Sequence, residues 1–326
     1  MSRLILAFFL SILGYGQIMS PIVAGSGGAF TLTATTVGAS KTVTITRLTL
    51  NGIATLNWGD GSTTVITSQS TGTWTHVYAT GGTYTIKLPN ARMIVGLQLS
   101  DAQLGGMNTN QLRSSSINYF YVTAITGSTI RSADMSAWRP TTWYLLSMPT
   151  GTYTISSADI SAWRPTYFYL YSLPTGTYTI SSADMSAWRP SNWYLASLPT
   201  GTYTISSADM SAWTTTQTLY LYANVGQVTT INSYTDFTGL VALRNLQLQN
   251  NALTQAQVNA VLQGLWTARA SFTYATPSLT INGTNAAPSG IYQTNCPTPA
   301  TGKEWAYDLV HETCTGGGYP WTVTTN

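Results

Sequence analysis

The chain carries little charge: only 7% of its 326 residues are Asp, Glu, Lys or Arg, whereas about a quarter is usual in soluble domains. Its 13 basic and 10 acidic residues leave a formal net charge of +3, and the arginines are dispersed. The basic stripe of a nucleic-acid-binding protein is therefore missing. Disorder is also disfavoured, because 20 Tyr and 11 Trp supply large apolar side chains that disordered chains lack. We expect a folded protein with no nucleic-acid partner.

Recognised catalytic motifs are absent as well. The sequence contains no Gly-x-Ser-x-Gly, no His-Glu-x-x-His and no phosphate-binding loop. His76 falls in an expected strand, and His311 lies near Glu304, Asp308 and Glu312 without a nucleophile or a metal-ligand spacing beside them. The sequence therefore predicts a protein that is not an enzyme and uses no cofactor.

Cysteine is scarce, since Cys296 and Cys314 are the only two, and they lie close together near the C-terminus. In an exported protein this pair predicts one disulfide. A zinc site is the weaker alternative, because His311 is the only histidine near the two cysteines.

Long hydrophobic runs are missing too. The longest apolar run at the N-terminus, residues 4–13, follows Arg3 and is too short to span a bilayer as an ordinary helix. Small residues follow at 23–25. We interpret residues 1–25 as a signal peptide, with a retained apolar N-terminal arm as the alternative, and expect no membrane span in the mature chain.

What the sequence has instead is repetition. The motif Ser-Ala-Asp-(Met/Ile)-Ser-Ala-Trp starts at Ser132, Ser157, Ser182 and Ser207, a period of 25 residues. A unit this short cannot bury its own apolar face, so the copies must stack as the coils of a solenoid. Each repeated residue then becomes a column along the stack.

The strand of each coil alternates between residues that face inward and outward. We place one set inside the stack: Trp143, Phe168, Trp193 and Leu219 with Leu145, Leu170, Leu195 and Leu221. The outward residues then form two columns: Tyr119, Tyr144, Tyr169, Tyr194 and Tyr220, and beside them Tyr121, Leu146, Tyr171, Ala196 and Tyr222. Tyrosine suits recognition of a protein or of sugar rings. We predict a binding face made of Tyr119, Tyr144, Tyr169, Tyr171, Tyr194, Tyr220 and Tyr222; a ladder that only stabilises the sheet is the alternative.

Two further columns follow from the period. Asp134, Asp159, Asp184 and Asp209 each precede a turn, and we interpret them as caps of backbone N–H groups. Arg139, Arg164 and Arg189 follow five residues later and are expected to neutralise them. Calcium ligation and acid–base catalysis are the alternatives for this acidic column. The column of Trp138, Trp163, Trp188 and Trp213 is expected in the core.

The region before the repeats contains Thr-rich alternating runs at residues 30–35, 41–50, 54–58, 63–66, 73–78 and 83–88, which predict a small β-sandwich. Within it stand Trp58-Gly59-Asp60-Gly61-Ser62, His76-Val77-Tyr78 and Gly82-Thr83-Tyr84-Thr85-Ile86. Asp60 is expected to form an Asx turn. This combination resembles the PKD-type domain of bacterial and archaeal surface proteins. The resemblance implies an extracellular spacer or adhesion module.

The last coil carries Leu243-x-x-Leu246-x-Leu248-x-x-Asn251, the pattern of leucine-rich repeats. Thr254 can then cap a terminal helix with apolar Val258, Val261, Leu262, Leu265 and Trp266. The Asp-Met-Ser-Ala-Trp blocks resemble the BspA-like leucine-rich repeats of bacterial surface proteins. Thr-Gly-Thr-Tyr-Thr-Ile replaces the usual convex segment of that family, so a second short strand at residues 153–155 is an option.

The expected fold is therefore mainly β. Residues 26–91 form a PKD-like sandwich, residues 92–283 a leucine-rich-repeat-like solenoid with a terminal helix, and residues 284–326 a capping segment that ends in a strand at 319–324. We expect a secreted or cell-surface adhesion protein whose partner is a protein or carbohydrate on a cell surface. A phage or virion-associated receptor-binding protein, a secreted carbohydrate-active enzyme, and a self-associating filament or sheath subunit are the alternatives.

Overall fold

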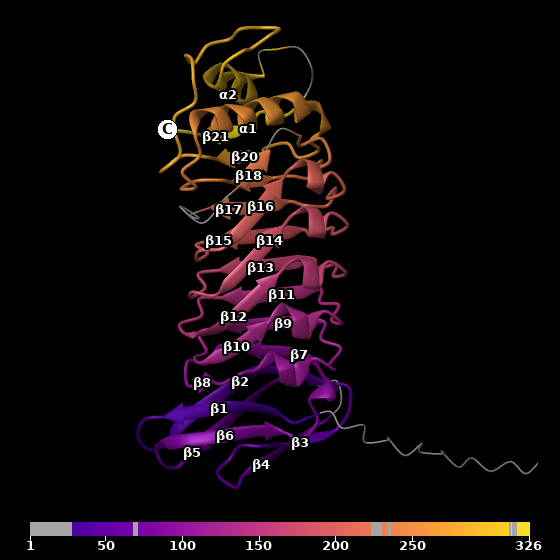
Figure 1. Cartoon of the computed structure of the whole chain (residues 1–326), viewed down its shortest axis with the longest axis vertical. Coiled ribbons are helices and arrows are strands. Elements are labelled where there is room, and N and C mark those ends of the chain that lie inside the picture. Colours follow the sequence, from indigo (N-terminus) through magenta and orange to yellow (C-terminus); the bar gives the residue numbers. More distant parts are fainter. Residues whose placement is uncertain (1–27, 68–70, 223–229, 234–235, 313, 315–317) are drawn as a thin grey trace, which may run out of the picture.

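The computed structural model describes residues 28–67, 71–222, 230–233, 236–312, 314 and 318–326, and in this part the chain is mainly β (Figure 1). The segment 1–25, interpreted above as a signal peptide, lies outside the described residues. The elements are stacked along one long axis, with the N-terminal strands at one end and both α-helices at the other. An elongated stack is what short repeats require, because each repeat buries its apolar face only against its neighbours.

The N-terminal unit contains six strands at nearly the predicted positions: β1 (Phe30–Thr36), β2 (Lys41–Leu50), β3 (Ala54–Asn57), β4 (Thr63–Ile66), β5 (Gly72–Tyr78) and β6 (Gly82–Leu88). One sheet has the order β4-β3-β6-β1-β8, where β8 is Leu104–Gly105. The strands β2 and β5 belong instead to an eleven-stranded sheet, in which β2 pairs antiparallel with β7 (Ile94–Leu99). Backbone pairing thus crosses the boundary predicted at residue 91.

Each repeat adds one strand to each of two sheets, and the strands of neighbouring repeats pair in parallel. The eleven-stranded sheet, called here the face sheet, has the order β21-β20-β19-β17-β15-β13-β11-β9-β7-β2-β5. Its coil strands are β9 (Tyr119–Thr123), β11 (Thr142–Leu146), β13 (Tyr167–Tyr171), β15 (Asn192–Ala196), β17 (Thr218–Tyr222), β19 (Asn245–Gln247), β20 (Ser278–Thr280) and β21 (Thr322–Thr324). The second, called the back sheet, contains β10 (Ser128–Arg131), β12 (Gly151–Ser156), β14 (Thr177–Ser181), β16 (Thr202–Ser206) and β18 (Thr230–Ser233).

Short 3-10 turns lead from the back sheet to the face sheet in four coils: η3 (Ser132–Met135), η4 (Ala158–Ile160), η5 (Ala183–Met185) and η6 (Ala208–Met210). Three further turns lie elsewhere: η1 (Ala91–Met93) before β7, η2 (Thr109–Leu112) before β9, and η7 (Arg269–Ser271) after the helix that ends at Ala268. The second strand suggested at residues 153–155 is present as β12, and its counterparts β14 and β16 occupy the same place in the next two coils. Each such coil is therefore a strand, a turn and a second strand.

The core lies between the two sheets. The predicted inward set is buried, with Trp143, Leu145, Phe168, Leu170, Trp193 and Leu219 at 0% exposure and Leu195 and Leu221 at 2%. The predicted core column of Trp138, Trp163, Trp188 and Trp213 is fully buried as well. Each of these indole N–H groups donates to a carbonyl of the preceding coil, as Trp163 Nε1 does to Met135 O at 3.2 Å. The column therefore both fills the core and joins successive coils.

Two helices close the C-terminal end of the stack (Figure 1). The predicted helix is α1 (Gln255–Ala268), which begins at a Thr254–Gln257 capping box and buries Val258, Val261, Leu262 and Leu265. A second helix, α2 (Gly302–His311), lies within the segment for which only a strand was expected. It begins at the capping box of Thr301 and Glu304, a spacing that by itself predicts a helix start.

Candidate binding face

The tyrosine face is built on the outer side of the face sheet, and strand register sets its columns. Parallel pairing aligns Tyr121 with Tyr144, then Tyr144 with Tyr169, Tyr169 with Tyr194, and Tyr194 with Tyr220. We call these five residues, on five consecutive strands, the central tyrosine column: Tyr121, Tyr144, Tyr169, Tyr194 and Tyr220. All five are half-buried.

The predicted column starting at Tyr119 is wrong by two residues at its first position. Tyr119 pairs with Thr142, and Tyr121 is the residue aligned with Tyr144. The 25-residue period predicts Tyr119 opposite Tyr144, but this coil advances by 23 residues in the aligned strands. Tyr119 still lies on the outer face, where Arg47 packs over its ring at 4.1 Å and its hydroxyl donates to Gln98 Oε1 at 3.2 Å.

The rings of the central column contact one another directly. Ring centroids are 5.2 Å apart for Tyr121 and Tyr144, 4.3 Å for Tyr144 and Tyr169, 5.1 Å for Tyr169 and Tyr194, and 5.0 Å for Tyr194 and Tyr220. These spacings follow from the distance between neighbouring strands, about 4.8 Å. Only Tyr169 and Tyr194 stack face to face, with an interplanar angle of 13°; the other three pairs meet at 57° to 63°.

A second line of residues flanks the central column. Tyr171 and Tyr222 follow Tyr169 and Tyr220 by two residues, at the next outward position of their strands. Both pack edge-on against Tyr194, with ring centroids at 5.9 and 5.6 Å. The Tyr194 and Tyr222 hydroxyls form a hydrogen bond. On the opposite side, Asn192 Nδ2 donates to the Tyr169 hydroxyl at 3.1 Å.

The structure adds Tyr167 to the residues named from the sequence. Tyr167 is aligned with Thr142 and Asn192 and is 38% exposed, more than any tyrosine of the central column. The prediction did not include Tyr167 because it considered only the outward positions that come after the inward residue Phe168. Tyr167 comes directly before Phe168, and by the same alternation it also lies on the outer face.

Burial disfavours ionisation of three tyrosines of the central column. Burial, followed by the neighbouring tyrosines, raises the pKa of Tyr144, Tyr194 and Tyr220 above the usual value of 10.0. Ionisation would place a charge among close neighbouring rings, which is unfavourable. The face therefore offers hydroxyl groups as hydrogen-bond donors and acceptors together with apolar ring edges.

The aspartate column has a different role from the one predicted. Asp159, Asp184 and Asp209 each accept a hydrogen bond from a serine hydroxyl of the preceding coil, and the donors are Ser132, Ser157 and Ser182 at 2.6, 2.5 and 2.6 Å. The same hydroxyl oxygens accept backbone N–H groups, for example Ser157 Oγ from Ser181 N at 2.8 Å. We call this arrangement the Ser–Asp ladder. It ties each coil to the next instead of capping the turn of its own coil.

The predicted pairing of this column with Arg139, Arg164 and Arg189 is also wrong. Each of these arginines donates to the carbonyl of the tryptophan that precedes it, namely Trp138, Trp163 and Trp188. Among the described residues, the one ion pair of the column joins Arg113 Nε to Asp134 Oδ1, at 4.0 Å.

Three polar side chains meet at the N-terminal unit. Asp60 accepts from Ser62 N at 3.0 Å, which is the predicted Asx turn, and from the Ser62 hydroxyl at 2.5 Å. His76 Nε2 lies 2.6 Å from Asp60 Oδ2 and 3.3 Å from Ser62 Oγ. A catalytic triad needs the acid and the nucleophile on different ring nitrogens, whereas both contact the same one here. The group fixes a turn, and His76 stacks on Trp58 at 5.1 Å.

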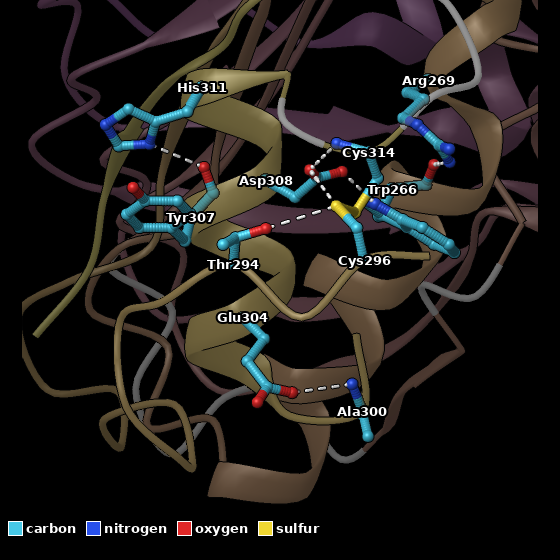
Figure 2. The surroundings of a disulfide bond; sticks show 10 residues. All are labelled: Trp266, Arg269, Thr294, Cys296, Ala300, Glu304, Tyr307, Asp308, His311 and Cys314. Atoms are coloured by element: carbon cyan, nitrogen blue, oxygen red, sulfur yellow. Dashed lines mark hydrogen bonds between the residues drawn. A yellow bond between two sulfur atoms is a disulfide. The ribbon is translucent and has the colours of Figure 1, made fainter. Parts of the chain in front are cut away.

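The C-terminal cap contains a disulfide between Cys296 and Cys314, with Cα atoms 5.1 Å apart (Figure 2). Asp308 lies beside it and accepts from Cys314 N at 2.6 Å and from Trp266 Nε1 at 2.5 Å, so it connects α1, α2 and the bridge. The two sulfurs and a carboxylate oxygen of Asp308 lie within 4.8 Å of one another. Because the sulfurs are bonded to each other, neither is a thiolate that could ligate zinc.

No helix among the described residues is long and apolar enough to cross a membrane. The comparisons with known proteins found no matching family model, no matching curated protein and no matching solved structure.

Proposed function

We propose that this protein is a non-catalytic adhesion protein, secreted or held at a cell surface, which binds a protein or glycan through its tyrosine face. The observation that carries the proposal is the central tyrosine column: five tyrosines on consecutive strands of one exposed sheet face, without a charged residue among them. Large neutral amphipathic side chains in a continuous strip are typical of recognition surfaces.

The finer fold assignment belongs to the same proposal. A PKD-like unit followed by a leucine-rich-repeat-like stack is supported by the antiparallel strands before residue 91 and by the parallel strands after it. In the last coils, the buried Asn251 side chain donates to the carbonyls of Leu221 and Leu248, and Asn285 repeats the contact with Leu248 and Ile281. Such asparagine contacts are what the predicted leucine-rich-repeat consensus requires at that position.

Export is supported by the disulfide, since such bonds persist in oxidising compartments. An enzymatic function has less support. The column of Asp134, Asp159, Asp184 and Asp209 accepts serine or threonine hydroxyls of the preceding coil, and the only described histidine–carboxylate pair fixes a turn.

The test is a binding comparison on a glycan array and on intact bacterial cells, using the Tyr169→Ala, Tyr194→Ala double variant. The matched control is Tyr292→Ala, Tyr319→Ala, which removes two exposed tyrosines of the C-terminal cap. If the proposal holds, the first variant loses most of the signal of the native protein while its circular dichroism is unchanged, because central aromatic anchors carry much of an interface energy. Equal binding by a folded Tyr169, Tyr194 variant would refute the proposed face.

A further inference from the structure

The two ends of the stack differ from its shaft in the apolar residues that they expose. Among the described residues, four exposed large apolar side chains lie in the N-terminal unit and four in the C-terminal cap, while Tyr167 is the one on the coils between them. The N-terminal group is Val37, Ile53, Val65 and Val77, and the C-terminal group is Ile291, Tyr292, Val310 and Tyr319. Exposed apolar residues gathered in this way mark contact surfaces.

Both ends also present an open edge of the same sheet. The terminal strands of the face sheet are β5 and β21, at opposite ends of the long axis (Figure 1). On β21, Thr322 N donates to Pro277 O, and Thr324 O accepts from Ile281 N. Because groups alternate along a parallel strand, the N–H and C=O of Val323 point away from β20. These outward groups are a template for a further strand.

A cavity lies directly beside that edge. It has a volume of about 470 Å³ and is lined by Val323 and by Tyr292, Tyr307, Val310 and His311. Val323 is aligned with the buried Leu246 and Leu279 of the inner column, yet it is only half-buried. The cavity is thus where a further strand would place its inward side chain. Tyr307 and His311, stacked at 4.1 Å, form one wall on α2 (Figure 2).

The two ends carry opposite charge. Residues 28–91 contain three basic residues and one acidic residue, for a net charge of +2 with histidine neutral. Residues 284–326 contain one lysine and three acidic residues, for a net charge of −2. Like ends repel and unlike ends attract, so the charges favour contact between the N-terminal end of one copy and the C-terminal end of another.

We propose that copies of this protein associate head to tail, with the edge of β5 on one copy pairing with the edge of β21 on the next. The face sheet then continues from copy to copy, and an inward side chain of the incoming edge fills the cavity beside Val323. The two contacting surfaces are different patches, so the association does not close on itself and extends into a filament. The tyrosine face remains exposed along it. The proposal does not depend on what that face binds.

The experiment is sedimentation velocity of the folded protein over a concentration series at low and high salt. We expect species that grow with concentration and weaken with salt. Val323→Pro removes one outward N–H without removing a bond to β20, and Val310→Lys places a positive charge at the cavity of the acidic end. Thr75→Glu places a negative charge on the β5 edge of the basic end, so each charge opposes the attraction between the ends. Each variant should shift assembly to concentrations at least about tenfold higher.

The decisive arm mixes two variants blocked at different ends. Thr75→Glu and Val310→Lys should each stay monomeric alone and form a one-to-one dimer, and nothing larger, when mixed. Thr177→Glu, which adds the same charge as Thr75→Glu but on the shaft, is the matched control and should assemble as the native protein does. A native protein that stays monomeric throughout, or a single-end variant that assembles normally, overturns the proposal. Binding at the tyrosine face is measured separately and is unaffected by these outcomes.

Discussion

Neighbouring residues on the same strands form two aromatic columns with different surroundings. The inner column contains Trp143, Phe168 and Trp193, and the central tyrosine column contains the residue after each of them. Both stack at similar spacing, since Trp143 and Phe168 are 5.0 Å apart and Tyr144 and Tyr169 are 4.3 Å apart. The stacking is therefore a product of strand register and does not by itself distinguish core from surface.

What distinguishes the columns is the layer that lies across from them. Each inner ring meets a second tryptophan from the turn of its coil, as Trp193 meets Trp213 at 5.1 Å. Among the residues that the structure describes, no such layer covers the five tyrosines of the central column, and they stay half-buried. Packing on both sides makes the inner column essential for stability, whereas the outer column is available for recognition.

The largest loss of stability should come from deleting part of one repeat, because such a deletion breaks both columns. Removing residues 157–181, one whole period, keeps every later inward residue inward and should leave a shorter folded protein, because repeats contact mainly their neighbours. Removing residues 157–168 should abolish folding. Far-ultraviolet circular dichroism and thermal melting distinguish the outcomes; a folded half-period deletion would contradict the proposed repeat unit.

Substitution within the inner column should come next. We expect Trp193→Ala to lower the free energy of unfolding by about 3–5 kcal/mol, because it leaves a large cavity against Trp213. The matched control is Trp193→Phe, since Phe168 already occupies the equivalent place and Trp193 Nε1 is buried without a hydrogen-bond partner. Denaturant unfolding measures the loss of stability in both variants. If Trp193→Phe loses as much as Trp193→Ala, the packing explanation is contradicted.

The Ser–Asp ladder should give an intermediate effect. Asp184→Ala leaves the Ser157 hydroxyl without its charged acceptor and should cost about 1–3 kcal/mol. A double-mutant cycle with Ser157→Ala should show coupling between the two sites. Chelator should leave the melting temperature unchanged. A large fall with chelator that calcium reverses would establish a metal site in place of this ladder.

A smaller effect is expected in the tyrosine column. Tyr169→Ala and Tyr194→Ala should each cost about 0.2–1 kcal/mol, because an outward side chain on a sheet contributes mainly through cross-strand contacts. The same unfolding measurement gives a direct comparison with Trp193→Ala. A cost for either tyrosine as large as that for Trp193 would show that the two columns are energetically alike.

The smallest change in stability should appear only at acidic pH, and it arises in the N-terminal unit. Desolvation raises the pKa of Asp60, but hydrogen bonds from Ser62 and His76 outweigh it and lower the pKa from 3.8 to about 2. Because the folded pKa is depressed, the stabilisation is present above about pH 4 and is lost as the pH falls through about 2. Asp60→Asn should flatten this dependence in melting curves, and an unchanged dependence in that variant would contradict the assignment to Asp60.

Much of the architecture followed from local patterns in the sequence. Alternation placed the six N-terminal strands within one residue and separated the inward from the outward residues of the coil strands, since a strand must expose one face and bury the other. The fixed period made stacking necessary, and the Thr254 cap with its apolar spacing predicted α1. The burial of Trp193 beside a half-exposed Tyr194 also follows from alternation alone.

Other features were decided only by the tertiary structure. The pairing of Tyr121 with Tyr144 depends on how far an irregular coil advances, which a 25-residue period cannot give. The partner of Asp184 is a serine 27 residues earlier, on the preceding coil, and local spacing pointed instead to its own turn and to Arg189. The open edges of β5 and β21 and the cavity beside Val323 likewise arise from where the stack ends. A sequence pattern specifies which side of a strand is buried, but contacts between coils depend on register, which the folded chain sets as a whole.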